Sequence, residues 1–260
     1  MALWLIGLGL HDAKDISVKG LERVRAAQHV YAEFYTAILS ATSRDDLEAF
    51  LAVKMQVLDR GGVEEGADLL ISQAREADVV LLTAGDPLTA TTHTDLMVRA
   101  KAAHVDVQII HGASIYSAAP GLLGLQHYKF GRTTTLVRPE PGWSPTSPFD
   151  AVAENHAAGL HTLVLLDIKA DEPWFMSASA GIAQLLELAK RTDNEWFGPT
   201  SQVGVVARAG GTPLVETGPA GAMAKRDFGP PLHCVVVPGK MHVVEEEAWA
   251  TFAIAIATSS

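Results

Sequence analysis

The sequence feature that most constrains the fold is an apolar run in the first half of the chain, which ends abruptly at Gly85-Asp86-Pro87. The run covers residues 79–84 behind a polar boundary at Asp78, and its continuity predicts a buried central strand. Glycine adopts backbone conformations that other residues avoid, and proline cannot continue a strand ladder, so a turn is expected next. Thr91 and Thr92 are then suited to cap a helix. Open α/β sheets bind ligands where strands end in such turns, although Gly-Asp-Pro by itself is more often an ordinary connection.

Apolar runs and helical patterns alternate along the first 111 residues. Strands are predicted at residues 3–10, 29–32, near 57, 79–84 and 105–110. Helices are predicted after Ser17, after the capping box at 43–46, over 63–77 and after Thr92. Alternation at this pace predicts a mostly parallel sheet that is covered by helices on both faces.

The character of the sequence changes after His111, and we predict a domain boundary there. The predicted architecture is two α/β domains: an N-terminal domain of residues 1–111 and a C-terminal domain of residues 112–260. In the second domain, strands are predicted at residues 133–137, 161–169, 203–209 and 233–239. Helices are predicted from Ser147 to just before Gly159, over residues 177–191, and at a last helix whose first turn holds the acids at 245–247. Those acids are expected to be solvated.

Composition narrows the class of protein. A formal net charge of −10 over 260 residues, with no evident basic patch, argues against nucleic-acid binding. The single cysteine, Cys234, excludes an internal disulfide framework and suits a reducing compartment. The first ten residues are apolar but lack a basic region before them, and no apolar stretch approaches the roughly 20 residues that span a bilayer. We therefore expect a soluble, cytoplasmic protein that engages neither nucleic acid nor membrane.

A dinucleotide-binding site is one alternative that the sequence raises. Gly7 and Gly9 follow the first predicted strand, and Glu33 follows the second at a distance suited to a ribose hydroxyl. The third glycine of the G-x-G-x-x-G motif would fall on Asp12, however. A carboxylate there would repel a pyrophosphate at the start of the helix, so the partial motif is weak support for a nicotinamide cofactor.

Motifs for zinc, phosphate-loop and serine-hydrolase chemistry are missing from the sequence. His156 and His161 are five residues apart, off one helix face, and Ser114 lacks the following glycine of a nucleophile elbow. What remains is a set of strand-end loops rich in backbone donors, hydroxyls and apolar side chains: residues 8–10, 85–89, 114–115, 166–167, 208–209 and 233. Such loops suit an amphipathic, nucleoside-like cofactor that brings its own chemistry, and no metal.

Eight motifs lie in order along residues 1 to about 247. They are LIGLGL at 5–10, DISVKG at 15–20, AEFYT at 32–36, GDPLTATTH at 85–93, SIYSA at 114–118, HYKFG at 127–131, LDIKA at 166–170 and VPGK at 237–240. Together they resemble the diphthine synthase family in its archaeal form. Because the motifs follow the family order over nearly the whole chain, the resemblance is specific.

The resemblance implies an S-adenosylmethionine-dependent methyltransferase of the tetrapyrrole-methylase (class III) fold, with the cofactor in the cleft between two α/β domains. The implied substrate is elongation factor 2 that carries a 3-amino-3-carboxypropyl group on one histidine. Its amino nitrogen would be methylated repeatedly in diphthamide biosynthesis, by a homodimeric enzyme. The family's cofactor contacts carry over to Leu10, Asp86, Thr89, Ser114, Ile115, Leu166, Ala209 and His233. The chain departs from the family pattern at Thr89, at Ala119-Pro120 and at Leu232.

The individual roles stay open from the sequence. Asp86 would accept a hydrogen bond from the cofactor's ribose or amino acid portion, or it would only stabilise the tight turn. His233 would hydrogen-bond the cofactor or serve as a structural histidine. We name no catalytic base, since solvent can take the amine proton. Candidates for a positive surface that meets an acidic protein partner are Lys129, Arg132 and Lys169.

Three other functions remain to be compared with this one. A methyltransferase of the same fold would act on a tetrapyrrole or another small molecule, and a deep closed pocket would favour it. A non-catalytic module would bind the cofactor without turnover, because a fold can keep a site and lose the activity. A dinucleotide-dependent dehydrogenase is already weakened by Asp12.

Overall fold

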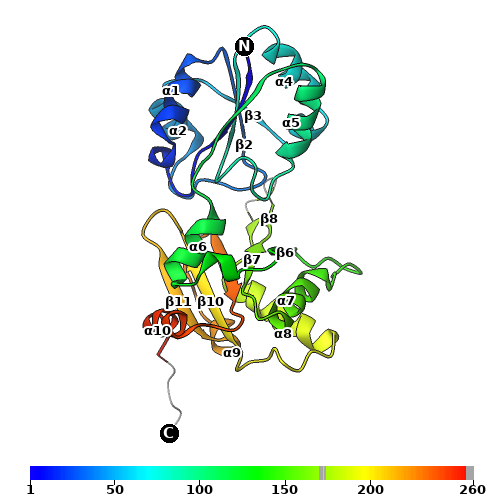
Figure 1. The fold of residues 1–260 in the computed structure, drawn as a ribbon, viewed down its shortest axis with the longest axis vertical. Coiled ribbons are helices and arrows are strands. Elements are labelled where there is room, and N and C mark those ends of the chain that lie inside the picture. The colour runs from blue at the N-terminus through cyan, green and yellow to red at the C-terminus, as the bar shows by residue number, and fades with distance from the viewer. Residues whose placement is uncertain (170–171, 173, 256–260) are drawn as a thin grey trace. The chain divides into compact units, whose positions relative to one another are not determined.

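The computed structural model describes residues 1–169, 172 and 174–255. Contacts divide them into two compact units (Figure 1): Met1–Ile115 with the described part of Lys169–Pro173, and Tyr116–Ile168 with the described residues from Trp174 onwards. Within these residues no helix combines the length and the apolar character that crossing a membrane requires. We keep the domain boundary after His111 as a proposal.

The first unit is built on a five-stranded sheet in the order β3-β2-β4-β1-β5. Its strands are β1 (Leu3–Gly7), β2 (His29–Glu33), β3 (Gln56–Leu58), β4 (Val79–Thr83) and β5 (Val107–Ile110). Every neighbouring pair is parallel, which confirms the predicted parallel sheet. All residues of β4 are buried because this strand lies at the centre of the sheet and is covered on both faces.

Helices cover both faces of this sheet, as predicted. On one face lie α1 (Val18–Ala26) and α2 (Arg44–Leu51), and on the other α4 (Ala67–Ala74) and α5 (His93–Ala102) (Figure 1). The shorter helices are η1 (Ala13–Asp15) and α3 (Arg60–Glu64). The central strand serves both cores because successive side chains point to opposite faces. Val80 and Leu82 join the α1–α2 core, whereas Leu81 joins the α4–α5 core.

The helix predicted over residues 63–77 is wrong in its bounds. The chain forms α3 and α4 instead, with Gly66 between them. A Cβ atom at Gly66 would lie only 2.6 Å from the carbonyl oxygen of Gly62, so the link between the helices requires glycine. Glycine also lowers helix propensity, which favours a break at this point.

The second unit has a five-stranded sheet in the order β11-β10-β12-β7-β6. Its strands are β6 (Thr134–Leu136), β7 (Thr162–Leu166), β10 (Gln202–Ala207), β11 (Leu214–Pro219) and β12 (His233–Val237), and β8 (Ile168–Lys169) pairs with β9 (Trp174–Phe175) separately. The β6–β7 pair is parallel, and the other pairs of this five-stranded sheet are antiparallel. Strand β11 was not predicted, since its sequence Leu-Val-Glu-Thr-Gly-Pro is not a continuous apolar run.

The helices of this part are α6 (Ile115–Leu123), η2 (His127–Lys129), α7 (Ser147–Ala157), α8 (Ala178–Arg191), α9 (Ala220–Met223) and α10 (Val243–Thr251). The core gathers Phe149 of α7, Leu185 of α8 and Val235 of β12, all fully buried. The residue before α7 is Thr146, so the predicted cap Ser147 is instead the first helical residue.

The prediction that the acids of the last helix are solvated is wrong for Glu245, which is fully buried. Its Oε1 accepts the Gln126 backbone N–H at 2.9 Å and lies 3.1 Å from Nε2 of His161. Its Oε2 accepts a hydrogen bond from the Lys129 ammonium. Burial raises the pKa of Glu245, but the Lys129 ammonium and the other donors outweigh it and lower the pKa to about 2.

We predict that Glu245→Gln destabilises the second unit by about 3 kcal/mol near neutral pH, because it leaves the Lys129 charge unpaired and the donors from Gln126 and His161 poorly paired. Since the folded pKa lies below the ordinary value of 4.5, the contribution is present above pH 4.5 and is lost as the pH falls towards about 2. Urea unfolding at several pH values measures both effects. Glu246→Gln, at the exposed neighbouring position, is the control. Equal effects of the two substitutions would contradict the prediction.

Candidate functional site

Three strand-end turns of the first unit meet at the carboxyl edge of its sheet. Gly9 and Gly85 exchange backbone hydrogen bonds of 3.3 and 2.6 Å, and both have positive φ angles, +82° and +77°. A Cβ atom at Gly7 would lie 2.5 Å from the Gly85 carbonyl oxygen, and one at Gly112 would lie 2.4 Å from the same atom. The turns after β1, β4 and β5 therefore pack backbone against backbone, which side chains at these positions would prevent.

Asp86 closes its own turn and also reaches the loop after β5. Its Oδ1 accepts the Leu88 backbone N–H at 3.0 Å and the Thr89 hydroxyl at 3.2 Å. Its Oδ2 lies 2.7 Å from Nδ1 of His111. The side chain is only 8% exposed. The turn-stabilising role considered for Asp86 is thus present, and Thr89 is held by it.

Acidic side chains organise the turn after β1. The backbone N–H groups of Leu10 and His11 both donate to Oδ2 of Asp15, at 3.1 and 2.7 Å. Asp12 accepts the Lys14 backbone N–H at the start of η1. Two carboxylates therefore lie where a dinucleotide pyrophosphate would need positive potential, which argues further against that cofactor.

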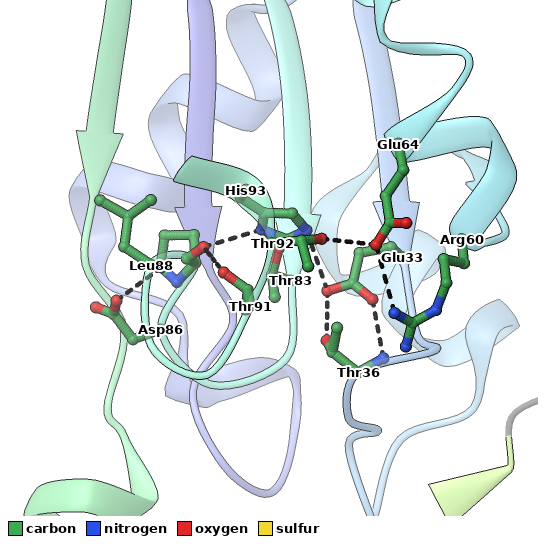
Figure 2. A network of polar contacts seen from close by, with 11 residues as sticks. Glu33, Thr36, Arg60, Glu64, Thr83, Asp86, Leu88, Thr91, Thr92 and His93 are labelled. Carbon is green, nitrogen blue, oxygen red and sulfur yellow. Dashed lines mark hydrogen bonds and ion pairs between the residues drawn. The ribbon is translucent and has the colours of Figure 1, made fainter. Parts of the chain in front are cut away.

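A buried polar network lies behind the Gly85-Asp86-Pro87 turn. Figure 2 shows the His93 ring beside Glu33 and Thr83, with Asp86 and Leu88 further along the same edge. Nδ1 of His93 donates to the Pro87 carbonyl oxygen at 2.9 Å, and its Nε2 lies 3.7 Å from Oε1 of Glu33. Both side chains are fully buried. The bond from Nδ1 therefore anchors the turn to the first helical residue of α5, and the other side of the same ring faces Glu33 at the end of β2.

Hydrogen bonds and burial set the charge of this network. Glu33 accepts the Thr36 hydroxyl at 2.6 Å and the Thr36 backbone N–H at 3.2 Å. Burial raises the pKa of Glu33 in spite of these bonds. Burial likewise lowers the pKa of His93, in spite of the bond to the Pro87 carbonyl. The folded unit thus favours an uncharged acid beside an uncharged imidazole.

The caps predicted for α5 have other partners. Thr92 precedes the helix but makes no side-chain cap, and its hydroxyl donates to Oε1 of Glu64 at 2.9 Å. The Thr91 hydroxyl donates to the Pro87 carbonyl oxygen at 2.8 Å. Thr92 therefore ties the loop to α3, whereas Thr91 closes the loop on itself.

The predicted cofactor contacts separate into two groups. Leu10, Asp86, Thr89 and Ser114 lie on the turns that follow β1, β4 and β5 in the first unit, and Ile115, the last residue of that unit, is the first residue of α6. Parallel strands β1, β4 and β5 end at one edge, so residues that are far apart in the sequence come together there.

The other three predicted contacts share one edge of the second sheet. Leu166 ends β7, Ala209 follows β10, and His233 begins β12, which is antiparallel to both of these strands. Nδ1 of His233 accepts the Ala178 backbone N–H at 3.1 Å, and its Nε2 donates to the Pro230 carbonyl oxygen at 2.9 Å. Both ring nitrogens therefore have partners within the chain, which favours the structural role considered for this side chain.

Sequence reasoning gave no role to two histidines at this site. His111 directly follows β5, and the signal that could have found it is the one that found Asp86: a polar residue where a strand ends. His93 lies within the pattern of α5, where nothing in the sequence indicates its burial. Among the described residues no cluster of three or more His, Cys, Asp or Glu could hold a metal ion.

Comparisons with known proteins fit this architecture. Residues 2–239 match the family described as Tetrapyrrole (Corrin/Porphyrin) Methylases. A crystal structure of diphthine synthase has a TM-score of 0.88 and 38% identity, over 99% of this chain and 98% of that one. The fold is therefore that of the tetrapyrrole methylases, a class of methyltransferase.

Curated relatives narrow the class of methyltransferase further. The diphthine synthase of Methanococcus maripaludis is 45% identical over 247 residues, which cover 95% of this chain and 96% of the relative. That of Methanocaldococcus jannaschii is 45% identical over 249 residues, with the same coverage of both. The chain belongs to the tetrapyrrole methylase family and, within it, to the diphthine synthases. The resemblance found in the sequence motifs is thereby confirmed.

We predict that Glu33→Gln stabilises the first unit relative to the wild type as the pH rises, because the amide reproduces the neutral acid that burial favours. Burial raises the pKa of Glu33 in the folded wild type above 4.5, so the protonated acid contributes stability below pH 4.5, and this contribution is lost as the pH rises through the folded-state pKa. The gain of Glu33→Gln over the wild type should approach about 1.4 kcal/mol for each pH unit between the unfolded-state and folded-state pKa of Glu33.

Thermal unfolding of both proteins between about pH 4.5 and 8 measures this gain. Glu22→Gln, at an exposed position of α1, is the matched control and should show no pH-dependent gain. A difference between Glu33→Gln and wild type that does not change with pH would show that Glu33 is charged throughout.

Proposed function

We propose that the chain uses S-adenosylmethionine to methylate, repeatedly, the amino group of the 3-amino-3-carboxypropyl histidine of elongation factor 2 in diphthamide biosynthesis. The observation that carries the proposal is identity of about 45% to proteins named diphthine synthase, over 95% of this chain. The match to a methylase family over residues 2–239 supports the reaction type.

The turns of the first unit suit the proposed cofactor. A Cβ atom added to Gly85 would meet no atom within 4 Å, so open space lies beside the Gly85-Asp86-Pro87 turn. The Asp86 carboxylate can accept hydrogen bonds from a ribose hydroxyl or an ammonium group. We propose that Leu10, Asp86, Thr89, Ser114, Ile115, Leu166, Ala209 and His233 contact the cofactor, with His233 contributing through its backbone. The cofactor would supply an electrophilic methyl carbon on a sulfonium sulfur.

The residues of the chain have to orient the substrate amine and exclude water. Alignment of two reactants can supply roughly 7–11 kcal/mol of the barrier. Of the cations considered for a protein partner, Lys129 is engaged with Glu245 and the Lys240 carbonyl oxygen, whereas Arg132 is exposed. We therefore propose Arg132 ahead of Lys129 as a contact to elongation factor 2, and we propose a cytoplasmic homodimer, to be tested by light scattering and fractionation.

Mass spectrometry of elongation factor 2 tests the proposed function. The factor with the aminocarboxypropyl histidine is incubated with this protein and S-adenosylmethionine, and the same factor with an unmodified histidine is the control. Gains of whole methyl units confined to the modified histidine would support the proposal, and their number would give the extent of methylation. No gain on a competent substrate would overturn it. If calorimetry then still showed binding of the cofactor, the functions left would be methylation of a small molecule or cofactor binding without catalysis.

We predict that Asp86→Asn weakens binding of S-adenosylmethionine roughly 10- to 150-fold, the range expected for losing a hydrogen bond to a charged group. Asparagine keeps an acceptor for the Leu88 N–H and Thr89 hydroxyl, so the turn should survive. Isothermal calorimetry measures the affinity, and thermal unfolding checks the fold. Asp45→Asn, at an exposed position of α2, should bind like the wild type. An unchanged affinity in Asp86→Asn would restrict Asp86 to the turn.

A further inference from the structure

A carboxylate–imidazole pair stands at the edge where the three turns meet. Oδ2 of Asp86 lies 2.7 Å from Nδ1 of His111, within hydrogen-bonding distance. The two members differ in environment, because the Asp86 side chain is 8% exposed and that of His111 is 69% exposed. A buried carboxylate thus holds an imidazole that solvent, or a ligand, can reach.

The hydrogen bond determines which ring nitrogen of His111 carries the proton. An ionised carboxylate only accepts, so Nδ1 donates its N–H to Asp86 and the lone pair of Nε2 stays available. Among the described residues no hydrogen bond to Nε2 of His111 is found. The same arrangement of carboxylate, imidazole and free Nε2 lone pair makes histidine a general base in other enzymes.

The backbone around His111 is fixed. The next residue, Gly112, packs so closely on Gly7 and Gly85 that a Cβ atom on it would lie 2.4 Å from the Gly85 carbonyl oxygen. Asp86 is held in turn by the Leu88 N–H and the Thr89 hydroxyl. Both members of the pair are therefore positioned by the turns that carry the proposed cofactor contacts.

Other charged groups on the neighbouring elements have their own partners. Asp15 accepts the N–H groups of Leu10 and His11, and Asp12 accepts that of Lys14. Glu33 is bound to Thr36 and faces His93. Asp86 is the carboxylate that contacts His111 among the described residues.

We propose that His111, held by Asp86, is the general base that deprotonates the substrate amine before each methylation. This inference rests on the proposed function, in which the methylated group is an amine. A base is needed because the protonated amine, an ammonium group, has no lone pair with which to attack a methyl carbon. It adds a residue to the reaction that the sequence motifs did not assign, and it makes His111 a catalytic residue and Asp86 its positioning residue.

The proton that the substrate ammonium loses passes first to His111 and then to water. One N–H bond of the substrate ammonium breaks, its electron pair stays on nitrogen as the nucleophilic lone pair, and the proton moves to Nε2 of His111. The Asp86 carboxylate stabilises the imidazolium that forms. Nε2 then releases the proton to bulk water, which restores the base. Repeated methylation requires this reset, and the 69% exposure of His111 allows it.

The central variant is His111→Asn, because the asparagine amide can keep a donor towards Asp86 while removing the base. The matched control is His104→Asn: His104 is exposed in the same unit, and its φ of +58° is one that asparagine tolerates. We expect His111→Asn to bind S-adenosylmethionine within about threefold of the wild type and to lower the methylation rate by about 10²- to 10⁴-fold near pH 7. The deficit should shrink as the pH rises, since solvent then deprotonates the amine. His104→Asn should behave as the wild type.

Two further measurements separate a base from a structural residue. Imidazole added to His111→Ala should restore part of the rate, which no purely structural role predicts. Nitrogen-15 NMR of the free wild-type protein should show neutral His111 as the Nδ1–H tautomer, and Asp86→Asn should lose that preference.

Several results would overturn the inference. They are an unchanged rate and pH profile in His111→Asn, an equal loss of cofactor binding and rate in that variant, or an Nε2–H tautomer in the wild type. Failure of the proposed function is distinguishable, because the wild type itself would then leave elongation factor 2 unmethylated.

Discussion

The arrangement of the site depends on the contact between the turns after β1, β4 and β5. The main chains at Gly7, Gly85 and Gly112 lie so close together that a Cβ atom added to Gly7 or Gly112 would lie 2.4 to 2.5 Å from the Gly85 carbonyl oxygen. Backbone hydrogen bonds between Gly9 and Gly85 join two of the turns directly. Because the sheet is parallel, all of its strands end at this edge, and these glycines allow the turns to meet there.

Two carboxylate–imidazole pairs at this edge differ because their surroundings differ. Glu33 and His93 are both fully buried, 3.7 Å apart, and burial favours the neutral form of each. Asp86 and His111 are 2.7 Å apart, with the imidazole largely in solvent. The first pair is therefore suited to holding the turn through the Pro87 carbonyl, and the second to exchanging protons with a substrate and with water.

Much of the first unit could be predicted from the sequence, because its signals are local. The run ending at Gly85-Asp86-Pro87 is the central strand β4, and Ser17 and Ser43 cap α1 and α2 through their side chains. Strands and side chains whose partners lie far away in the sequence were predicted less well. The sequence did not reveal β11, and Glu245 looked solvated although it meets Lys129, which is 116 residues away.

The sequence by itself determined the family, the strands with continuous apolar runs and the turns that need glycine. Those features depend on residue type and on spacing over a few residues, and they can be read without a partner. Only the tertiary structure decided that His111 meets Asp86, that His93 is buried beside Glu33 and that the ring nitrogens of His233 are occupied within the chain. A contact between residues 25 or 60 positions apart depends on strand order and register, and these follow from the packing of the whole unit.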